Sequence, residues 1–202
     1  MKFFKKSDNN NKQEIVPQKI KTEFGKALIH ANKKEVIKLI EKYNIDCKGF
    51  IDDKKNRPVL LDAVTVLNDY QDSADQLEII TYLIEHGADP DMKAKEGYNS
   101  LHVSLNYHDL SNVTLLLIEK GNIDVNSQDD HGNNPIFIAI REYGKTWRPE
   151  QKTVNELRFK IIEELLKKGA DLDLINNHGI SSRRWLEISD DTKLHELIKR
   201  YE

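Results

Sequence analysis

The sequence predicts an all-α solenoid of about five helix-turn-helix units that stack side by side. Three observations support this fold class. Two short motifs alternate along the chain in a fixed order, a glycine recurs where each second helix must end, and apolar residues recur at helical spacing. Because a single pair of short helices cannot bury its apolar faces, such units are stable only when neighbours stack on them.

The first element in chain order is a polar tail. Residues 1–20 include the segment SDNNNKQE, which offers little to a core, so we expect disorder at least to residue 12. The preceding KFFKK has only two apolar residues, too few for a signal peptide and only weak support for contact with a membrane. Residues 21–202 are then expected to form a single domain.

The repeat itself consists of two motifs. The first is LIEHGADPDM (83–92), which returns as LIEKGNIDVN (117–126), LLKKGADLDL (165–174) and, more weakly, LIEKYNIDCK (39–48). The second is EGYNSLHVSL (96–105), which matches HGNNPIFIAI (131–140), KNRPVLLDAV (55–64) and, loosely, HGISSRRWLE (178–187). Gly87 and Gly121 are 34 residues apart but Gly121 and Gly169 are 48 apart, so one unit contains an insertion.

The helix boundaries follow from the punctuating residues. Gly87, Gly121 and Gly169 stand where the second helix must stop, and glycine adopts the left-handed conformation that closes a helix at little steric cost. Pro58 and Pro135 stand at the first turn of the next helix, where a missing N–H is harmless.

These motifs resemble the ankyrin repeat, whose pattern runs Asp-x-x-Gly-x-Thr-Pro-Leu-His-x-Ala and then Leu-Leu-x-x-Gly-Ala-Asp-x-Asn. The resemblance covers roughly residues 23–201, with both half-motifs at the right phase. Asn99 and Ser100 stand in place of Thr-Pro, while His102 keeps the family's histidine. The resemblance implies that His102 bonds the neighbouring turn and that the chain binds protein.

Four potential metal ligands lie close together in the third unit: His86, Asp89, Asp91 and His102. We interpret them as scaffold residues rather than as a metal site. His131 and His178 occupy equivalent turn positions one unit apart, and no His-x3-His or Cys-x2-Cys spacing is present. We therefore expect neither a metal nor a cofactor.

Catalytic motifs are also missing from the sequence. There is no P-loop and no Gly-x-Ser-x-Gly nucleophile motif. Asp191, which stands with Asp190 and His195, is interpreted as a helix cap because an apolar stripe follows it. The lone Cys47 is interpreted as a small apolar residue. We therefore expect no enzyme.

The contact surface is predicted partly by resemblance. The family pattern implies contacts at the finger tips and at the exposed ends of the first helices, which in the second unit are Asp53, Lys54, Asn56, Val64 and Thr65. The complete set of predicted partner-binding residues is Tyr98, Tyr107, Arg141, Glu142, His131, Asn133, Tyr143, Trp147, Arg148, Tyr70, Asp69 and Asp72. Tyr98, Tyr107 and Arg141 are favoured because binding energy concentrates in such residues, with ordinary solvated surface as the alternative.

Two insertions contribute several of these residues. They are LNDYQDSADQ (67–76) and EYGKTWRPEQKTVNE (142–156). Insertions in repeat proteins map to loops on one face, often the binding face. A tryptophan such as Trp147 is costly to leave in water and useful at an interface. Two alternatives stay open: Trp147 folds back onto the scaffold, or the insertions extend the helices into a longer hairpin.

The predicted function follows from the resemblance. The chain is similar to small stand-alone bacterial ankyrin-repeat proteins of the toxin-immunity type, which implies a cytoplasmic monomer that neutralises one cognate toxin, for example a nuclease, by occlusion in interbacterial competition. The alternative is a regulatory or host-directed adaptor that binds without inhibiting. With a net charge of -3 and no long apolar run, neither nucleic acid nor a membrane is an expected partner.

Overall fold

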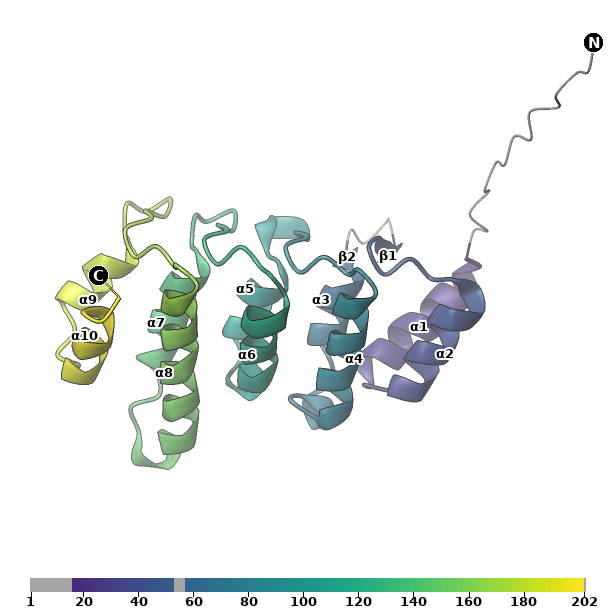
Figure 1. Ribbon diagram of the computed structural model, residues 1–202, viewed down its shortest axis with the longest axis horizontal. Helices are drawn as coiled ribbons and strands as arrows, with labels where there is room; N and C mark the ends of the chain where they lie inside the picture. The colour runs from purple at the N-terminus through teal and green to yellow at the C-terminus, as the bar shows by residue number, and fades with distance from the viewer. Residues whose placement is uncertain (1–15, 53–56, 202) are drawn as a thin grey trace, which may run out of the picture.

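The computed structural model describes residues 16–52 and 57–201, and within them it confirms the predicted all-α solenoid. The helices are α1 (Gln18–Ile29), α2 (Lys33–Tyr43), α3 (Val59–Val64), α4 (Ala74–Glu85), α5 (Ser100–Leu105), α6 (Ser111–Lys120), α7 (Pro135–Tyr143), α8 (Lys152–Lys167), α9 (Ser182–Glu187) and α10 (Thr192–Ile198). They form five pairs in an elongated array (Figure 1). None of these helices is both long and apolar enough to span a bilayer.

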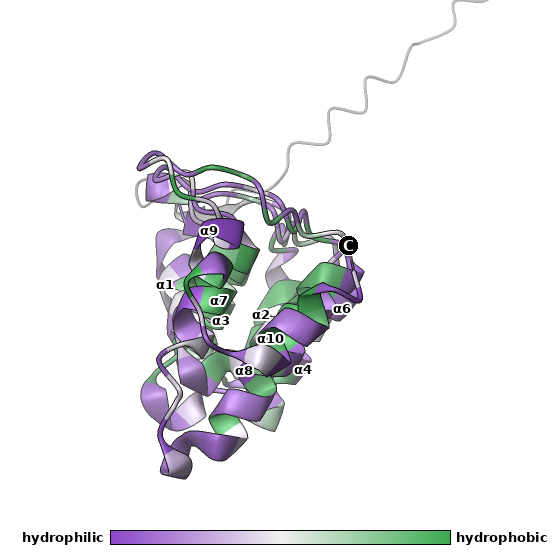
Figure 2. Ribbon diagram, turned by 90° about the vertical axis from the view of Figure 1, so that its left-hand side faces the viewer, coloured by the Kyte–Doolittle hydropathy of each residue, from purple (hydrophilic) through white to green (hydrophobic). Residues whose placement is uncertain are grey.

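The array has two rows of helices and two edges. Seen along its length, the first helices of the pairs lie in one row and the second helices in the other (Figure 2). The closest helix pairs belong to the same unit or to adjacent units. The connections between units form one edge, here called the finger edge, and include 86–99, 121–134 and 168–181. The connections within units form the opposite edge, here called the turn edge: 30–32, 65–73, 106–110, 144–151 and 188–191 (Figure 1).

The first described finger contains the only strand pair within residues 16–52 and 57–201. Strand β1 (Phe50–Asp52) pairs antiparallel with β2 (Arg57–Pro58). The intervening Asp53, Lys54 and Asn56 lie outside the described residues, as do residues 1–15 of the predicted tail. Of the other predicted contacts in this unit, Thr65 is partly buried, and the expectation is wrong for Val64, which is wholly buried at the end of α3. Helix α1 begins at Gln18, so its first turn lies inside the segment that the sequence predicts as tail.

Two of the three glycines that were expected to end a second helix do so in the left-handed conformation. Gly87 (φ 90°) and Gly169 (φ 83°) take the left-handed conformation after α4 and α8. The same expectation is wrong for Gly121, which stays helical with φ -73°. Asn122 adopts the left-handed conformation there instead, with φ 46°, which asparagine tolerates better than most residues. Pro135 is the first residue of α7, whereas Pro58 immediately precedes α3.

The insertions are divided between loop and helix. Helix α4 begins at Ala74 and α8 at Lys152, both inside the predicted insertions, so part of each insertion lengthens the second helix. What is left are the two long turn-edge connections, 65–73 and 144–151. The short 3-10 helix η1 (Asn68–Tyr70) lies in the first, and η4 (Pro149–Gln151) lies in the second.

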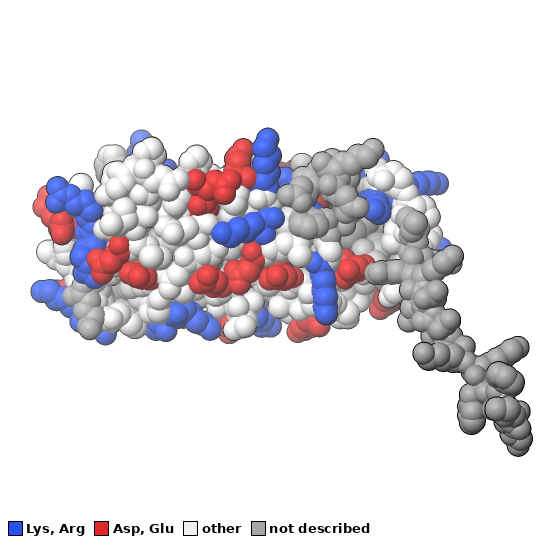
Figure 3. Space-filling model, turned by 90° about the horizontal axis from the view of Figure 1, so that it is seen from above, with Lys and Arg blue, Asp and Glu red and all other residues white. Residues whose placement is uncertain are grey.

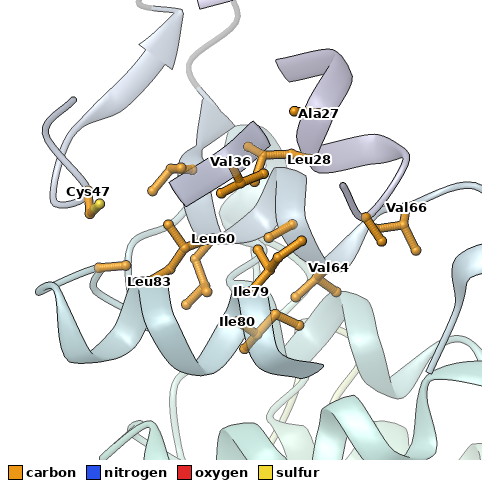
Figure 4. Packing of buried hydrophobic residues seen from close by; sticks show 14 of the residues in the cluster. Ala27, Leu28, Val36, Cys47, Leu60, Val64, Val66, Ile79, Ile80 and Leu83 are labelled. Atoms are coloured by element: carbon orange, nitrogen blue, oxygen red, sulfur yellow. The ribbon is translucent and has the colours of Figure 1, made fainter. Parts of the chain in front are cut away.

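The buried apolar side chains form two clusters that meet in the third unit. The first cluster includes Leu60 and Ile80 and is shown in Figure 4, where side chains from neighbouring helices point toward one another. Leu117 belongs to this first cluster, whereas Ile118 on the same helix belongs to the second. Cys47 is buried in the first cluster, as expected for a small apolar residue, and burial raises the pKa of its thiol to about 11.

Candidate protein-binding surface

Asx-type hydrogen bonds hold two successive turns of the finger edge. The Asp129 carboxylate accepts hydrogen bonds from the backbone N–H groups of His131 and Asn133, both at 2.9 Å. One unit later, Asn176 does the same for His178 and Ile180. Short polar side chains that bond the backbone two residues on stabilise tight turns in this way. The repeated histidine position therefore lies in a repeated turn.

Neighbouring fingers are also tied to each other. The N–H of Asp130 donates to the carbonyl oxygen of Glu96 (3.2 Å), and the N–H of Asn177 donates to that of His131 (2.9 Å). His102 joins this system from α5, because its Nε2 lies 3.3 Å from the carbonyl oxygen of Asn133. The bond from the family histidine to the neighbouring turn is therefore present, and burial lowers the pKa of His102.

The departures from Thr-Pro do not remove the helix caps. Asn99 and Asn134 accept hydrogen bonds from the third residue of α5 and of α7, at 3.0 and 3.2 Å. Ser181 caps α9 and Asp191 caps α10 in the same way, so the interpretation of Asp191 as a cap is confirmed. Asparagine and serine replace threonine well here because each offers an oxygen at the right distance.

The other potential metal ligands of the third unit have separate structural partners. The Nδ1 atom of His86 lies 2.7 Å from the Tyr82 carbonyl oxygen, and its ring stacks on that tyrosine. The Asp91 carboxylate accepts from the N–H of Asp124 in the next unit. Asp89 accepts from the N–H of Asp91 (2.9 Å). Among the described residues, no three His, Cys, Asp or Glu side chains group so as to hold a metal ion.

Two favoured contact residues, Tyr98 and Arg141, lie within electrostatic reach of each other. Burial raises the pKa of Tyr98, and the charge of Arg141 opposes that shift. The Tyr98 ring also lies 6.5 Å from the His131 ring, between centroids. Arg141 donates to the Asn106 side chain at 2.6 Å, which links α7 to the end of α5. Arg141 on α7 therefore lies between Tyr98 of the finger edge and Asn106 of the turn edge.

Four predicted contact residues are wholly or partly buried. Glu142 is buried, and although burial alone raises its pKa, hydrogen bonds from Lys145 and Arg141 outweigh this and hold the pKa below its usual value. Tyr143 is buried and donates its hydroxyl to Asp191 at 2.7 Å. Asn133 and Asp72 are partly buried, and both also serve the scaffold.

The role of Asp72 concerns the neighbouring unit. Helix α6 has no side-chain cap from its own N-cap residue, Leu110. The Asp72 carboxylate supplies one from the 65–73 connection, accepting from the N–H groups of Asn112 and Val113, both at 2.9 Å. This predicted insertion therefore braces the next unit, while Asp69 and Tyr70 in the same connection are exposed.

The turn edge carries most of the exposed large apolar side chains. Eight such residues occur among those described, and five lie on turn-edge connections: Leu67, Tyr70, Tyr107, Trp147 and Ile188. They come from four successive units, directly after α3, α5, α7 and α9. Because they share one edge of the array, these side chains are candidates for an interaction surface. The finger edge instead shows acidic side chains in a row with basic ones between them (Figure 3).

Trp147 is the most exposed of these residues, at 75%. The alternative that it packs back onto the scaffold is therefore wrong. Its neighbour Thr146 is buried and donates its hydroxyl to the Tyr143 carbonyl oxygen at 2.7 Å, which anchors the connection. The Arg148 guanidinium lies 5.6 Å from the centroid of the Trp147 ring, in a cation–π arrangement on the surface.

Two residues with notable environments were not predicted from the sequence. Arg158 on α8 is wholly buried and donates to the Leu105 carbonyl oxygen, and burial lowers its pKa to about 10. Its position three residues before Ile161 is in phase with the apolar stripe, which could have indicated burial. Trp185 on α9 lies partly exposed beside Phe137, with ring centroids 5.7 Å apart.

Stacked helix pairs with hydrogen-bonded fingers define a helical repeat protein of the protein-binding type. A family model described as ankyrin repeats in three copies matches residues 70–176, and the chain belongs to the ankyrin-repeat family. This fold serves protein interaction, and the described residues give no positive sign of catalysis.

Several relatives share part of the sequence. ANK repeat-containing protein nipk-1 of Caenorhabditis elegans is 31% identical over 98 residues, which are 47% of this chain and 15% of that protein. A putative ankyrin repeat protein of Fowlpox virus is 38% identical over 64 residues, 30% of this chain and 14% of that protein. Phosphocholine transferase AnkX of Legionella pneumophila is 30% identical over 133 residues, 65% of this chain and 12% of that protein. The match thus spans only 12–15% of the length of these relatives.

Proposed function

We propose that the chain binds one cognate protein through a surface that runs from Tyr98 and Arg141 to the turn edge. The observation that carries this proposal is the row of exposed apolar side chains on four successive units, with Tyr107 and Trp147 at its centre. Aromatic residues of this kind supply most of the binding energy at protein interfaces. Glu142 and Tyr143 are left out because their side chains are buried.

The finer proposal is that binding neutralises the partner. A toxin whose active site is covered by the turn edge would be inhibited by occlusion, which is the immunity function that the sequence resemblance implies. One relative is bacterial, which is compatible with this setting. A basic partner such as a nuclease would meet Asp69 in the 65–73 connection, whereas Asp72 is already bonded to α6.

A specific observation favours the adaptor as a second candidate. In the relatives the matched segment is a small part of a much longer protein, so repeats of this kind occur beside other segments. An adaptor would use the same turn edge without blocking its partner. A nucleic-acid ligand is disfavoured because the finger edge mixes acidic with basic side chains rather than presenting a basic stripe (Figure 3).

The test is a pull-down from the native organism followed by quantitative binding. Tyr107→Ala and Trp147→Ala should each weaken binding by about 1–2 kcal/mol or more, without a change in melting temperature. Tyr201→Ala is the control, because this aromatic side chain is also exposed but lies outside the turn edge. Wild-type affinity in both turn-edge variants would show that the surface is wrong.

A second measurement separates the two candidate functions. If the partner is toxic when expressed alone, co-expression with this chain should relieve the toxicity. Relief that is lost in Trp147→Ala supports immunity. Tight binding without any relief favours the adaptor.

A further inference from the structure

A pocket of about 610 Å³ lies between the 144–151 connection and the last unit. Ile140 and Tyr143 of α7 line it on one side, and Trp185 and Leu194 of the last unit line it on the other. Trp147 stands on the connection that borders it. Its volume falls in the range of about 300–1,000 Å³ that is usual for ligand pockets.

Hydrogen bonds hold the walls of this pocket in place. The Tyr143 hydroxyl donates to Asp191 at 2.7 Å, which ties α7 to the start of α10. Burial and the contact with Asp191 raise the pKa of Tyr143 to about 12, so this donor keeps its proton at neutral pH. On the other wall, the Asn155 side chain donates to the Thr146 hydroxyl at 3.0 Å. A site that exists before its ligand arrives loses less entropy on binding.

The apolar part of the lining is incompletely covered. Trp147 is 75% exposed and Trp185 is 37% exposed, although both rings have apolar neighbours in the same pocket. A large aliphatic or aromatic side chain placed between them would remove apolar surface from water, at about 25 cal/mol per Å². The lining therefore suits one bulky apolar side chain.

The charges of the lining favour an acidic neighbour for that side chain. Three charged residues line the pocket: Arg148, Lys152 and Asp191. The Asp191 carboxylate already accepts from the Leu194 N–H (2.9 Å) and from the Tyr143 hydroxyl. Arg148 forms no ion pair with any residue in the described ranges, and Lys152 has only Glu156 at 4.0 Å. A cation would meet two positive groups at the pocket, whereas a carboxylate would meet two suitable partners.

We propose that this pocket receives an extended segment of a protein partner that carries a large apolar side chain next to Asp or Glu. The inference rests on the proposed protein-binding function and specifies the chemistry of the partner. In this proposal the 144–151 connection has a binding role, because it supplies both Trp147 and Arg148 to the pocket.

The test uses the only two tryptophans of the chain, which both line this pocket, so tryptophan fluorescence reports on it directly. The probe is the blocked peptide acetyl-Gly-Ser-Leu-Asp-Glu-Ser-Gly-amide, titrated into the full chain at low salt. A saturable blue shift of the emission is expected. Two matched peptides, one with Leu replaced by Ser and one with Asp-Glu replaced by Lys-Lys, should give no saturable shift.

A charge-reversal pair provides the control within the protein. Arg148→Glu keeps both tryptophans and should weaken peptide binding at least about threefold, because it replaces an attraction for the acidic peptide with a repulsion. Lys160→Glu reverses an exposed charge on α8 outside the pocket and should leave the affinity within about twofold. Circular dichroism checks that both variants fold.

The outcomes are distinguishable from those of the proposed function. No saturable shift with the acidic peptide, or tighter binding of the Lys-Lys peptide, would overturn the pocket assignment even if Trp147→Ala weakens the natural partner. Conversely, peptide binding that Arg148→Glu weakens supports the pocket even if the turn edge proves irrelevant to a partner from the native organism.

Discussion

At the scale of single residues, His102 shows how one side chain serves two units. It lies wholly buried on α5, donates its backbone N–H to the capping Asn99 side chain, and its ring reaches the Asn133 carbonyl oxygen of the next finger. Burial lowers its pKa below the ordinary value of 6.5. The unfolded chain therefore binds more protons than the folded chain between the two pKa values, and protonation favours unfolding there.

The first prediction concerns this histidine. The free energy of unfolding should fall as the pH drops below about 6.5, because the stability that neutral His102 provides is lost through protonation of the unfolded state. His102→Gln keeps a capping side chain but cannot titrate. Chemical denaturation at about pH 7.5 and 5.5 should show a smaller drop for the variant. An equal drop in both proteins would assign the pH dependence to other groups.

The second prediction tests the repeat phase. Leu117 is wholly buried on α6, so Leu117→Asp should lower the free energy of unfolding by about 3 kcal/mol or more, because it buries an unpaired carboxylate. Lys95→Asp, on the exposed finger edge, should change it by less than about 0.5 kcal/mol. The comparison needs only urea denaturation midpoints. If the two midpoints coincide, the assignment of α6 to the core is wrong.

Residues that repeat with the motif could be predicted, whereas residues with individual tertiary partners could not. The turn role of His102 is what the resemblance to the family motif implies, and the cap at Asp191 follows from the apolar stripe after it. Glu142 and Tyr143 were placed on the surface, but they lie inside because Lys145 and Asp191 satisfy their polar atoms. Such pairings join residues that no local pattern connects, so the sequence carries no periodic signal for them.

At the scale of elements, the 65–73 connection acts as a brace between units. Its length was interpreted as a sign of partner binding, yet Asp72 uses it to cap α6 of the next unit. The hydrogen bonds to α6 therefore offset part of the entropy that is lost when this connection is ordered. The 144–151 connection differs, because its most prominent side chain, Trp147, points to solvent.

The third prediction separates these two roles. Asp72→Ala removes the cap of α6 and should lower the free energy of unfolding by about 1 kcal/mol, within the range of 0.5–2 kcal/mol for lost caps. Asp69→Ala changes an exposed residue of the same connection and should have less than about 0.5 kcal/mol of effect. Guanidinium denaturation of both variants decides. A loss as large in Asp69→Ala would mean that general charge, not the cap, stabilises the connection.

At the scale of the whole molecule, contacts between neighbours hold the array together. The two apolar clusters share no residue and meet in the third unit, and the last unit packs mainly on α7 and α8. Stability in such an array is approximately a sum over units and their interfaces. The overall architecture was predictable for the same reason, since each unit repeats the same local pattern, whereas the pocket beside the last unit depends on how two particular units meet.

The fourth prediction follows from this linear organisation. Leu197 is wholly buried on α10, and Leu197→Asp should speed amide hydrogen exchange in α9 and α10 while α3 and α4 stay protected. Hydrogen exchange followed by mass spectrometry on peptides resolves the two regions. Uniformly faster exchange along the whole chain would show that the array unfolds as one cooperative unit.

The anchoring of the 144–151 connection also has a consequence for diversification. Thr146 and Asn155 close the base of this connection with side-chain hydrogen bonds, while Trp147 and Arg148 extend beyond it. Substitutions at these two outer positions leave the helix caps and the finger hydrogen bonds untouched. If this connection is the contact surface proposed above, exchange of these two residues would change binding specificity without loss of the fold, and other short sequences could be grafted onto the same base.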